Sequence, residues 1–173
     1  HLQVGPDPPT RQMARMMEAF ERALAGLAAD MVLVVGDANS TLACALAAVK
    51  CGAPVVHVEA GLRSFDRAMP EEINRILVDQ LAGRLFVTEA SGVENLRREG
   101  VPDERVHLTG NTMIDTLLAH LDRLQPPVLW ADLGLQAGAY FVVTLHRPAN
   151  VDETGSLARL LEAIGTGTRG LPV

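Results

Sequence analysis

Two short apolar runs separated by one helix length constrain the fold of this chain more than any other feature. The first run, MVLVV, covers residues 31–35, and the second, PVVHV, covers residues 54–58. Continuous apolar runs of this length are typical of strands buried in a parallel sheet. The alanine-rich segment 39–51 suits a helix between them, because parallel strands need a long crossover connection. We therefore expect a right-handed βαβ unit, which belongs to the α/β class.

The same alternation of apolar runs and amphipathic segments continues along the chain. It predicts further strands at 83–88, 106–109 and 139–147. It predicts further helices at 11–27, 70–81, 91–99, 112–124 and 153–164. In the helix at 70–81 we expect Ile73, Leu77 and Leu81 to face the core. The overall prediction is a parallel Rossmann-like sheet with helices on both faces.

The proline pair Pro126-Pro127 is the best candidate for a domain boundary, because it ends a predicted helix and weakly periodic residues follow it. We expect a first Rossmann-like domain at 1–124, a linker at 125–138 and the start of a second domain at 139–173. The chain has 173 residues, of which 48% are hydrophobic, so it holds one well-cored domain and little more.

The charge pattern argues against nucleic acid and membrane partners. The formal net charge is −6 and the basic residues are scattered, so no basic patch is available for nucleic acid or an anionic membrane surface. No run approaches the roughly 20 apolar residues of a membrane span, and no leader opens the chain. We therefore expect a cytoplasmic protein.

Ionisable residues are densest in segment 54–75. Glu59 directly follows one apolar strand and Asp37 follows the strand before it, so both should lie at the carboxyl edge of the sheet. Ligands bind at that edge in open parallel sheets. Pro70 and Glu71 have the composition of a first helical turn, which allows Glu71 to approach Glu59 across one loop.

Each carboxylate also has a plainer interpretation. Glu71 and Glu72 at a helix start are often surface residues that the helix dipole favours. Glu59 can instead form a structural ion pair with Arg63. These alternatives predict different partners for the same side chains.

The sequence has no common motif for a nucleotide cofactor or a metal. It contains no G-x-G-x-x-G, no Walker loop, no G-x-S-x-G and no metal-like Cys/His pairing. We expect no cofactor and no metal, and we expect His57 and His107 to be core histidines. What remains is a set of acidic residues at strand ends and the pair His146-Arg147 on a later strand. Carboxylates in a partly closed cleft can act as base and acid.

Five segments carry a resemblance to a known family: GDANSTLACALAA, PVVHVEAGLRSFDRAMPEEINR, LFVTEAS, VHLTGNTMIDTLL and VTLHRPANVD. In unbroken order between residues 30 and 152, they resemble the non-hydrolysing UDP-N-acetylglucosamine 2-epimerases. The resemblance implies two Rossmann-like domains, as in two-domain glycosyltransferases, with a nucleotide sugar in the cleft between them. It also implies a homodimer in the complete protein and no nicotinamide cofactor.

The resemblance also implies roles for particular residues. The implied reaction interconverts UDP-GlcNAc and UDP-ManNAc, by elimination of UDP to a 2-acetamidoglucal and re-addition. The implied catalytic residues are Asp37, Glu59, Glu71 and His146. The implied substrate-binding residues are Arg63, Arg75, Arg147 and Asn111.

The chain also departs from the family pattern. An opening strand with a Gly-Thr-Arg-Pro-Glu type loop is missing, and so is the acidic Ser-Gly-Gly loop of the second domain. We therefore expect an internal fragment that is inactive by itself. Two alternatives stay open: a hydrolysing epimerase that releases UDP and ManNAc, and a non-catalytic module that binds a nucleotide sugar or a partner.

Overall fold

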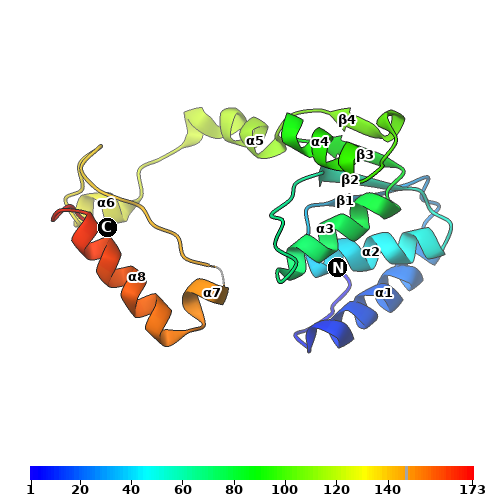
Figure 1. Ribbon diagram of the computed structural model, residues 1–173, viewed down its shortest axis with the longest axis horizontal. Helices are drawn as coiled ribbons and strands as arrows, with labels where there is room; N and C mark the ends of the chain where they lie inside the picture. The colour runs from blue at the N-terminus through cyan, green and yellow to red at the C-terminus, as the bar shows by residue number, and fades with distance from the viewer. Residues whose placement is uncertain (147) are drawn as a thin grey trace. The chain divides into compact units, whose positions relative to one another are not determined.

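The computed structural model describes the backbone of residues 1–146 and 148–173, and the side chains of residues 1–146, 150–153 and 155–173. These residues form two compact units, residues 1–119 and residues 120–173 (Figure 1). Each unit is described by itself.

The first unit alternates helices and strands as expected. Its elements are α1 (Pro9–Ala25), β1 (Val32–Val35), α2 (Asn39–Lys50), β2 (Val55–Ala60), α3 (Pro70–Leu81), β3 (Arg84–Val87), α4 (Ala90–Arg98), β4 (Val106–Leu108) and α5 (Thr112–His120), with a 3-10 turn at Asp103–Arg105. Most limits agree with the prediction to within about two residues. The exception is α5, which ends at His120 and is followed by a 3-10 turn at Leu121–Arg123.

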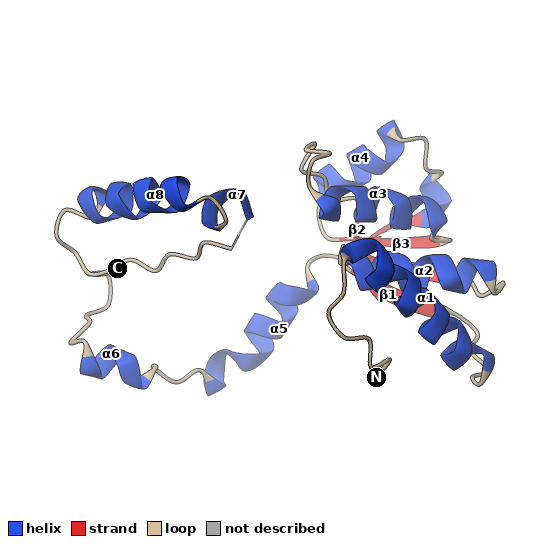
Figure 2. Ribbon diagram, turned by 90° about the horizontal axis from the view of Figure 1, so that it is seen from below, coloured by secondary structure: helices blue, strands red, loops and turns tan. Residues whose placement is uncertain are grey.

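The four strands form one parallel sheet in the order β1-β2-β3-β4. Because strand order follows chain order, right-handed crossovers place α2, α3 and α4 on the same face. Figure 2 shows α3 and α4 together on one side of β2 and β3. Helix α2 packs against β1 and α3, and α1 packs against α2. The predicted α/β class with a parallel sheet is confirmed. The prediction of helices on both faces is not met in the first unit, where the crossover helices α2, α3 and α4 share one face.

The core lies between the sheet and these helices. Val34, Leu85 and Val87 are buried sheet residues in this core. Helix α2 contributes the small side chains of Ala45 and Ala48 to this core, and its Ala43 and Ala47 are also buried. On edge strand β1 burial alternates, and Leu33 and Val35 are 58% and 53% exposed. The opposite face of the sheet is therefore open at β1.

Helix α3 turns a polar side inward, which the sequence prediction missed. Ile73 and Leu77, predicted to face the core, are both 46% exposed, and only Leu81 of the three packs against the core. The buried positions of α3 are Glu72, Asn74, Val78 and Asp79. Hydrophobic spacing was misleading here, because three of these buried side chains are polar and find hydrogen-bond partners inside the fold.

The two histidines expected in the core differ. His57 on the central strand β2 is fully buried, as predicted. His107 on edge strand β4 is exposed, so the prediction was wrong for this residue. Its ring lies 5.5 Å from that of Phe86 on the neighbouring strand.

The second unit contains α6 (Val128–Asp132), α7 (Pro148–Val151) and α8 (Thr154–Gly167). The strand predicted at 139–147 is absent from its described residues, 139–146. A strand needs a neighbour to pair its backbone groups, and no other strand lies in the described part of this unit. Instead the Phe141 amide donates to the Pro172 carbonyl at 2.8 Å. The predicted domain limits remain a prediction.

Candidate functional site

Asp37 lies where the sequence placed it, just past the carboxyl end of β1. Gly36 makes the turn with a φ of +69°, a conformation that favours glycine. The Arg75 guanidinium on α3 binds the Asp37 carboxylate, whose side chain is 38% exposed. The Asn74 amide donates to the Asp37 carbonyl and to Asn39 Oδ1, each at 2.9 Å. Helix α3 therefore holds both the backbone and the side chain of Asp37.

Glu59 is the penultimate residue of β2 and lies at a bulge between Val58 and Ala60. Its φ is +74°, in the left-handed region that non-glycine residues rarely adopt. Such a conformation costs on the order of 1–3 kcal/mol and is concentrated at functional sites. The carboxylate lies over Gly36, with Oε2 3.5 Å from the position that a Cβ there would take.

The proposed structural ion pair between Glu59 and Arg63 is wrong. The Arg63 guanidinium binds Asp79 and Glu99 instead, with Nη2 at 2.7 and 2.6 Å from their oxygens. Among the described side chains, those of residues 1–146, 150–153 and 155–173, the Glu59 carboxylate has no hydrogen-bond or ion-pair partner. A half-buried carboxylate without a partner is open to a ligand.

The two glutamates at the start of α3 have different environments. Glu71 is exposed, and its carbonyl accepts a hydrogen bond from Arg75 Nε at 3.3 Å. Glu72 is 1% exposed, and its carboxylate accepts the amides of Ser64 and Phe65, each at 2.9 Å. Burial alone would raise the pKa of Glu72, but these two amides and the nearby Arg75 outweigh it and lower the pKa. The surface interpretation is thus wrong for Glu72, which anchors the loop before α3.

Arg75 connects the acidic groups. It binds Asp37, reaches the Glu71 carbonyl, and has Nε 3.6 Å from Glu72 Oε2. The structure therefore gathers Asp37, Arg75 and the start of α3 at the carboxyl edge of the sheet, beside the Glu59 bulge. This region is the candidate active site.

The other predicted site residues are placed differently. Arg63 has a side chain that is only 1% exposed. Asn111 caps α5, since its Oδ1 accepts the Met113 amide at 2.9 Å. His146 is an exposed residue of the second unit, and Arg147 lies outside the described residues. Substrate contacts by these four residues remain predictions.

Sequence reasoning missed Asn74 and Asp79 as site-forming residues. Both lie on the buried side of α3, where the apolar pattern favoured Ile73 and Leu77. The only signal in the sequence was one polar residue in each turn of this helix. A helix face exposed to solvent produces the same pattern.

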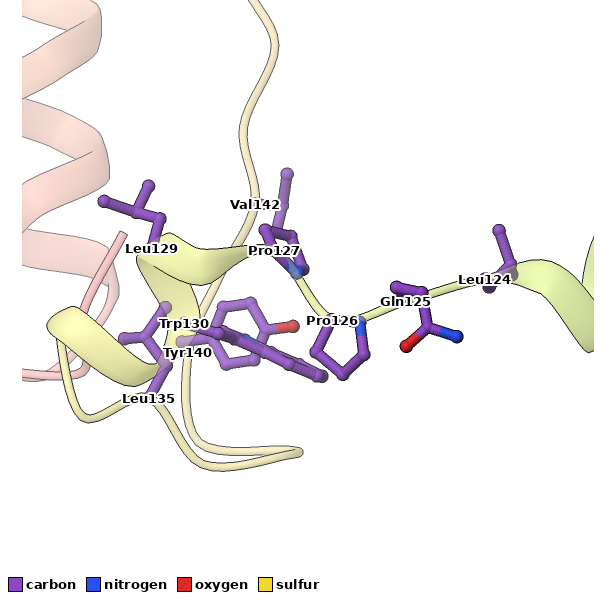
Figure 3. A pocket seen from close by; sticks show the side chains of 9 residues that line it. All are labelled: Leu124, Gln125, Pro126, Pro127, Leu129, Trp130, Leu135, Tyr140 and Val142. Atoms are coloured by element: carbon purple, nitrogen blue, oxygen red, sulfur yellow. The ribbon is translucent and has the colours of Figure 1, made fainter.

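The second unit contains an apolar pocket of its own (Figure 3). Pro126, Pro127, Trp130 and Tyr140 are among its lining residues, and the rings of Trp130 and Tyr140 meet edge to face at 5.7 Å. None of the predicted site residues lines it, so it adds nothing to the candidate active site. Across the described residues, no group of three or more His, Cys, Asp or Glu could hold a metal ion. No helix in the described ranges is long and apolar enough to cross a membrane.

Comparison with known proteins decides the family. A family model described as UDP-N-acetylglucosamine 2-epimerase matches residues 1–170. The chain belongs to this family. The UDP-N-acetylglucosamine 2-epimerase of Methanococcus maripaludis is 38% identical over 167 residues, covering 95% of this chain and 46% of the relative. The UDP-2,3-diacetamido-2,3-dideoxy-D-glucuronate 2-epimerase of Pseudomonas aeruginosa is 41% identical over 152 residues, covering 87% of this chain and 42% of the relative.

Solved structures of UDP-N-acetylglucosamine 2-epimerases share the fold. The Methanocaldococcus jannaschii enzyme in complex with UDP-GlcNAc and UDP has a TM-score of 0.83 at 38% identity, covering 95% of this chain and 46% of that one. The Rickettsia bellii enzyme has a TM-score of 0.85 at 28% identity, covering 98% of this chain and 45% of that one. The chain thus spans about half the length of the epimerases that it matches. The predicted family is confirmed.

Proposed function

We propose that this chain supplies the carboxylate side of the active site of a UDP-N-acetylglucosamine 2-epimerase. The observation that supports this most is Glu59, a carboxylate in a strained conformation that lacks a partner in the described part of the chain. It lies beside the Asp37–Arg75 pair in a member of the epimerase family. The proposed substrate is UDP-GlcNAc and the proposed product is UDP-ManNAc.

The proposed reaction needs a base, an acid and cations. A carboxylate takes the proton from sugar carbon 2, and the electrons of that C–H bond form a double bond to carbon 1. The bond from carbon 1 to the diphosphate oxygen breaks, and its electron pair leaves with UDP. Re-addition of UDP and delivery of a proton to the opposite face of carbon 2 complete the inversion.

The geometry suggests how the residues divide these tasks. Within the described chain, the carboxylates of Glu59 and Glu71 have no partner, so their oxygens can exchange a proton with the sugar. Arg75, and Arg147 by resemblance, would hold the leaving diphosphate, because a guanidinium binds phosphate oxygens in pairs. By resemblance, His146 is a further proposed catalytic residue.

The relatives also support a second candidate substrate. The Pseudomonas aeruginosa relative is named for a UDP-2,3-diacetamido-2,3-dideoxy-D-glucuronate. That name describes a uronate with nitrogen substituents at carbons 2 and 3, so epimerisation at carbon 2 needs the same two proton transfers.

The proposed function also includes non-hydrolysing chemistry, a cytoplasmic location and a homodimer.

The test is a graft of residues 30–119 into the Methanocaldococcus jannaschii enzyme, in place of its matching segment. Incubation with UDP-GlcNAc in heavy water should give UDP-ManNAc with deuterium at carbon 2, because the protein acid exchanges with solvent. Product without deuterium would contradict the scheme and would favour return of the original hydrogen by a nicotinamide cofactor. Release of UDP and free ManNAc would instead show a hydrolysing enzyme, in which water attacks the glycal.

Two controls complete this test. The grafted protein is also incubated with the UDP-linked diacetamido uronate. If it turns over this compound faster than UDP-GlcNAc, the uronate replaces UDP-GlcNAc as the proposed substrate. The 173-residue chain alone should show no detectable turnover. The match covers 46% of the Methanococcus maripaludis relative, and contacts from the remaining part would provide most of the binding energy that orients the sugar.

A further inference from the structure

One buried carboxylate lies at the centre of the hydrogen bonds that support both loops of the candidate active site. Asp79 on α3 is fully buried. Its Oδ1 lies 2.7 Å from His57 Nδ1, and its Oδ2 accepts the Gly61 amide at 3.1 Å. The Arg63 guanidinium binds the same Oδ2 at 2.7 Å.

The His57 ring extends this network to the other loop. Its second nitrogen, Nε2, lies 2.9 Å from the Gly36 carbonyl oxygen, directly before Asp37. A carbonyl oxygen only accepts hydrogen bonds, so Nε2 carries a proton. Asp79 therefore touches the loop after Glu59 directly, at Gly61, and the loop before Asp37 through His57.

The second nitrogen of the ring also faces an acceptor. A neutral imidazole has one N–H, which Nε2 already uses, so Nδ1 would then need a protonated Asp79. The other oxygen of Asp79 accepts the Gly61 amide and forms an ion pair with the Arg63 guanidinium, and both contacts favour the ionised carboxylate. The shared proton is therefore on His57.

The charges around the pair are compatible with a protonated His57. Arg63 carries one positive charge and binds Asp79 and Glu99, which carry two negative charges. His57, Arg63 and Asp79 have side chains that are at most 1% exposed. A charged His57 makes the four groups neutral as a set, with the second negative charge supplied by Glu99, whose side chain is 29% exposed.

We propose that His57 and Asp79 form a buried imidazolium–carboxylate pair that positions the two loops carrying Asp37 and Glu59. Neither residue would touch the sugar; both act through Gly36 and Gly61, and Arg63 acts with them rather than by binding substrate. The pair holds Gly61 two residues after Glu59, so it helps to keep Glu59 in its left-handed conformation. The positioning role rests on the proposed function, but the protonation of His57 can be measured without turnover.

The first experiment is magic-angle-spinning NMR of the full 173-residue chain with ¹⁵N-labelled histidine, a method that tolerates self-association. Replacing the four exposed histidines by Gln leaves His57 as the only labelled ring; these are His1, His107, His120 and His146. At neutral pH both ring nitrogens of His57 should show the shift of a protonated nitrogen. A ring nitrogen with a free lone pair would overturn the proposal.

The second experiment measures amide hydrogen exchange of the unaltered chain and of Asp79→Asn. The Gly61 amide should be protected in the unaltered chain, although its acceptor is a side chain. Asp79→Asn should speed exchange at residues 59–63 and 36–39 by about tenfold or more, because a hydrogen bond to a charged group is lost. Asp103→Asn is the matched control, since Asp103 pairs with Arg97 on the surface, and it should change neither segment.

The outcomes separate this inference from the proposed function. If Asp79→Asn fails to fold, the His57 spectrum and the Gly61 protection of the unaltered chain still decide. An unprotected Gly61 amide would overturn the positioning role. If the graft shows no epimerisation while both measurements agree with expectation, the proposed function fails and the buried pair stands.

Discussion

Glu59 is the residue where backbone energetics and chemistry conflict. Its positive φ costs free energy that a glycine would avoid, and its carboxylate has no partner in the described part of the chain to offset this cost. The sequence predicted its place at the end of a strand, because an apolar run stops there. The sequence could not predict the left-handed backbone, which depends on the bulge against β3.

Replacing Glu59 should therefore separate stability from activity. Glu59→Gly should stabilise the fold by about 1 kcal/mol, because the left-handed strain disappears, while removing the carboxylate. Glu59→Gln should leave stability within about 0.5 kcal/mol of the original, since the backbone cost remains. Urea denaturation of both variants checks this, and a destabilised Glu59→Gly would mean that the carboxylate supports the fold.

The candidate catalytic carboxylates make a second prediction at this scale. In the grafted enzyme, Asp37→Asn, Glu59→Gln and Glu71→Gln should each lower turnover by about a hundredfold or more, because each keeps the shape and removes a basic oxygen. Glu94→Gln is the control, since Glu94 pairs with Arg98 on the surface. Near-normal turnover of Glu59→Gln would remove the main support for the proposed function.

Glu72 makes a prediction about pH. Its pKa is lower in the folded chain than the ordinary value of 4.5, so its contribution is complete above about pH 4.5 and is lost as pH falls through the folded pKa. Glu72→Gln should be about 1–3 kcal/mol less stable at pH 7, because an amide nitrogen would face a backbone N–H. Denaturation between pH 7 and pH 3 should show this difference shrinking in acid. If the stability difference between Glu72→Gln and the original chain stays constant from pH 7 to pH 3, the lowered pKa assigned to Glu72 is refuted.

At the scale of elements, α3 shows what sequence periodicity can and cannot predict. Its limits at Pro70 and Leu81 were predicted from the proline and the acidic first turn. Its orientation was not, because the buried side depends on loops and strands distant in sequence, such as the amides of Ser64 and Phe65. Polar groups can be buried when such partners exist, and one sequence does not reveal them.

The contact between α4 and β3 gives a prediction about packing. A Cβ on Gly92 would lie 2.7 Å from Val87 Cγ1 and 3.3 Å from the Ala60 carbonyl oxygen. Gly92→Ala should destabilise the chain by about 1–3 kcal/mol, although alanine ordinarily favours a helix. Gly26→Ala is the control, because its added Cβ would meet only the Ala23 carbonyl oxygen at 3.6 Å. Thermal denaturation of both variants checks this, and equal stabilities would show that α4 shifts without cost.

At the scale of the whole molecule, the sequence predicted the first unit better than the second. The strands of the first unit have neighbours within it, so apolar runs were sufficient signals. The segment 139–146 carries the same signal but forms no strand, because its described surroundings offer no strand to pair with. Strand formation depends on a partner as well as on the run itself.

The open edge at β1 leads to a prediction about association. Leu33 and Val35 are more than half exposed, and β1 pairs on one side only in the described sheet. The 173-residue chain should self-associate, because such an edge pairs readily with another chain. The double change Leu33→Thr and Val35→Thr should raise the monomer fraction in sedimentation velocity, and Leu27→Thr, also exposed, should not. A monodisperse monomer of the original chain would contradict the prediction that this edge promotes association.

The strand order also says where a ligand crevice can form. In open α/β sheets the crevice opens at a topological switch point, where the strand order reverses and neighbouring helices go to opposite faces. The described sheet runs β1-β2-β3-β4 without such a reversal. A reversal can arise only beside a terminal strand, and of the two terminal strands β1 is the one that leads into Asp37. The edge that makes this chain prone to associate is thus the edge at which a strand paired to β1 would complete the crevice.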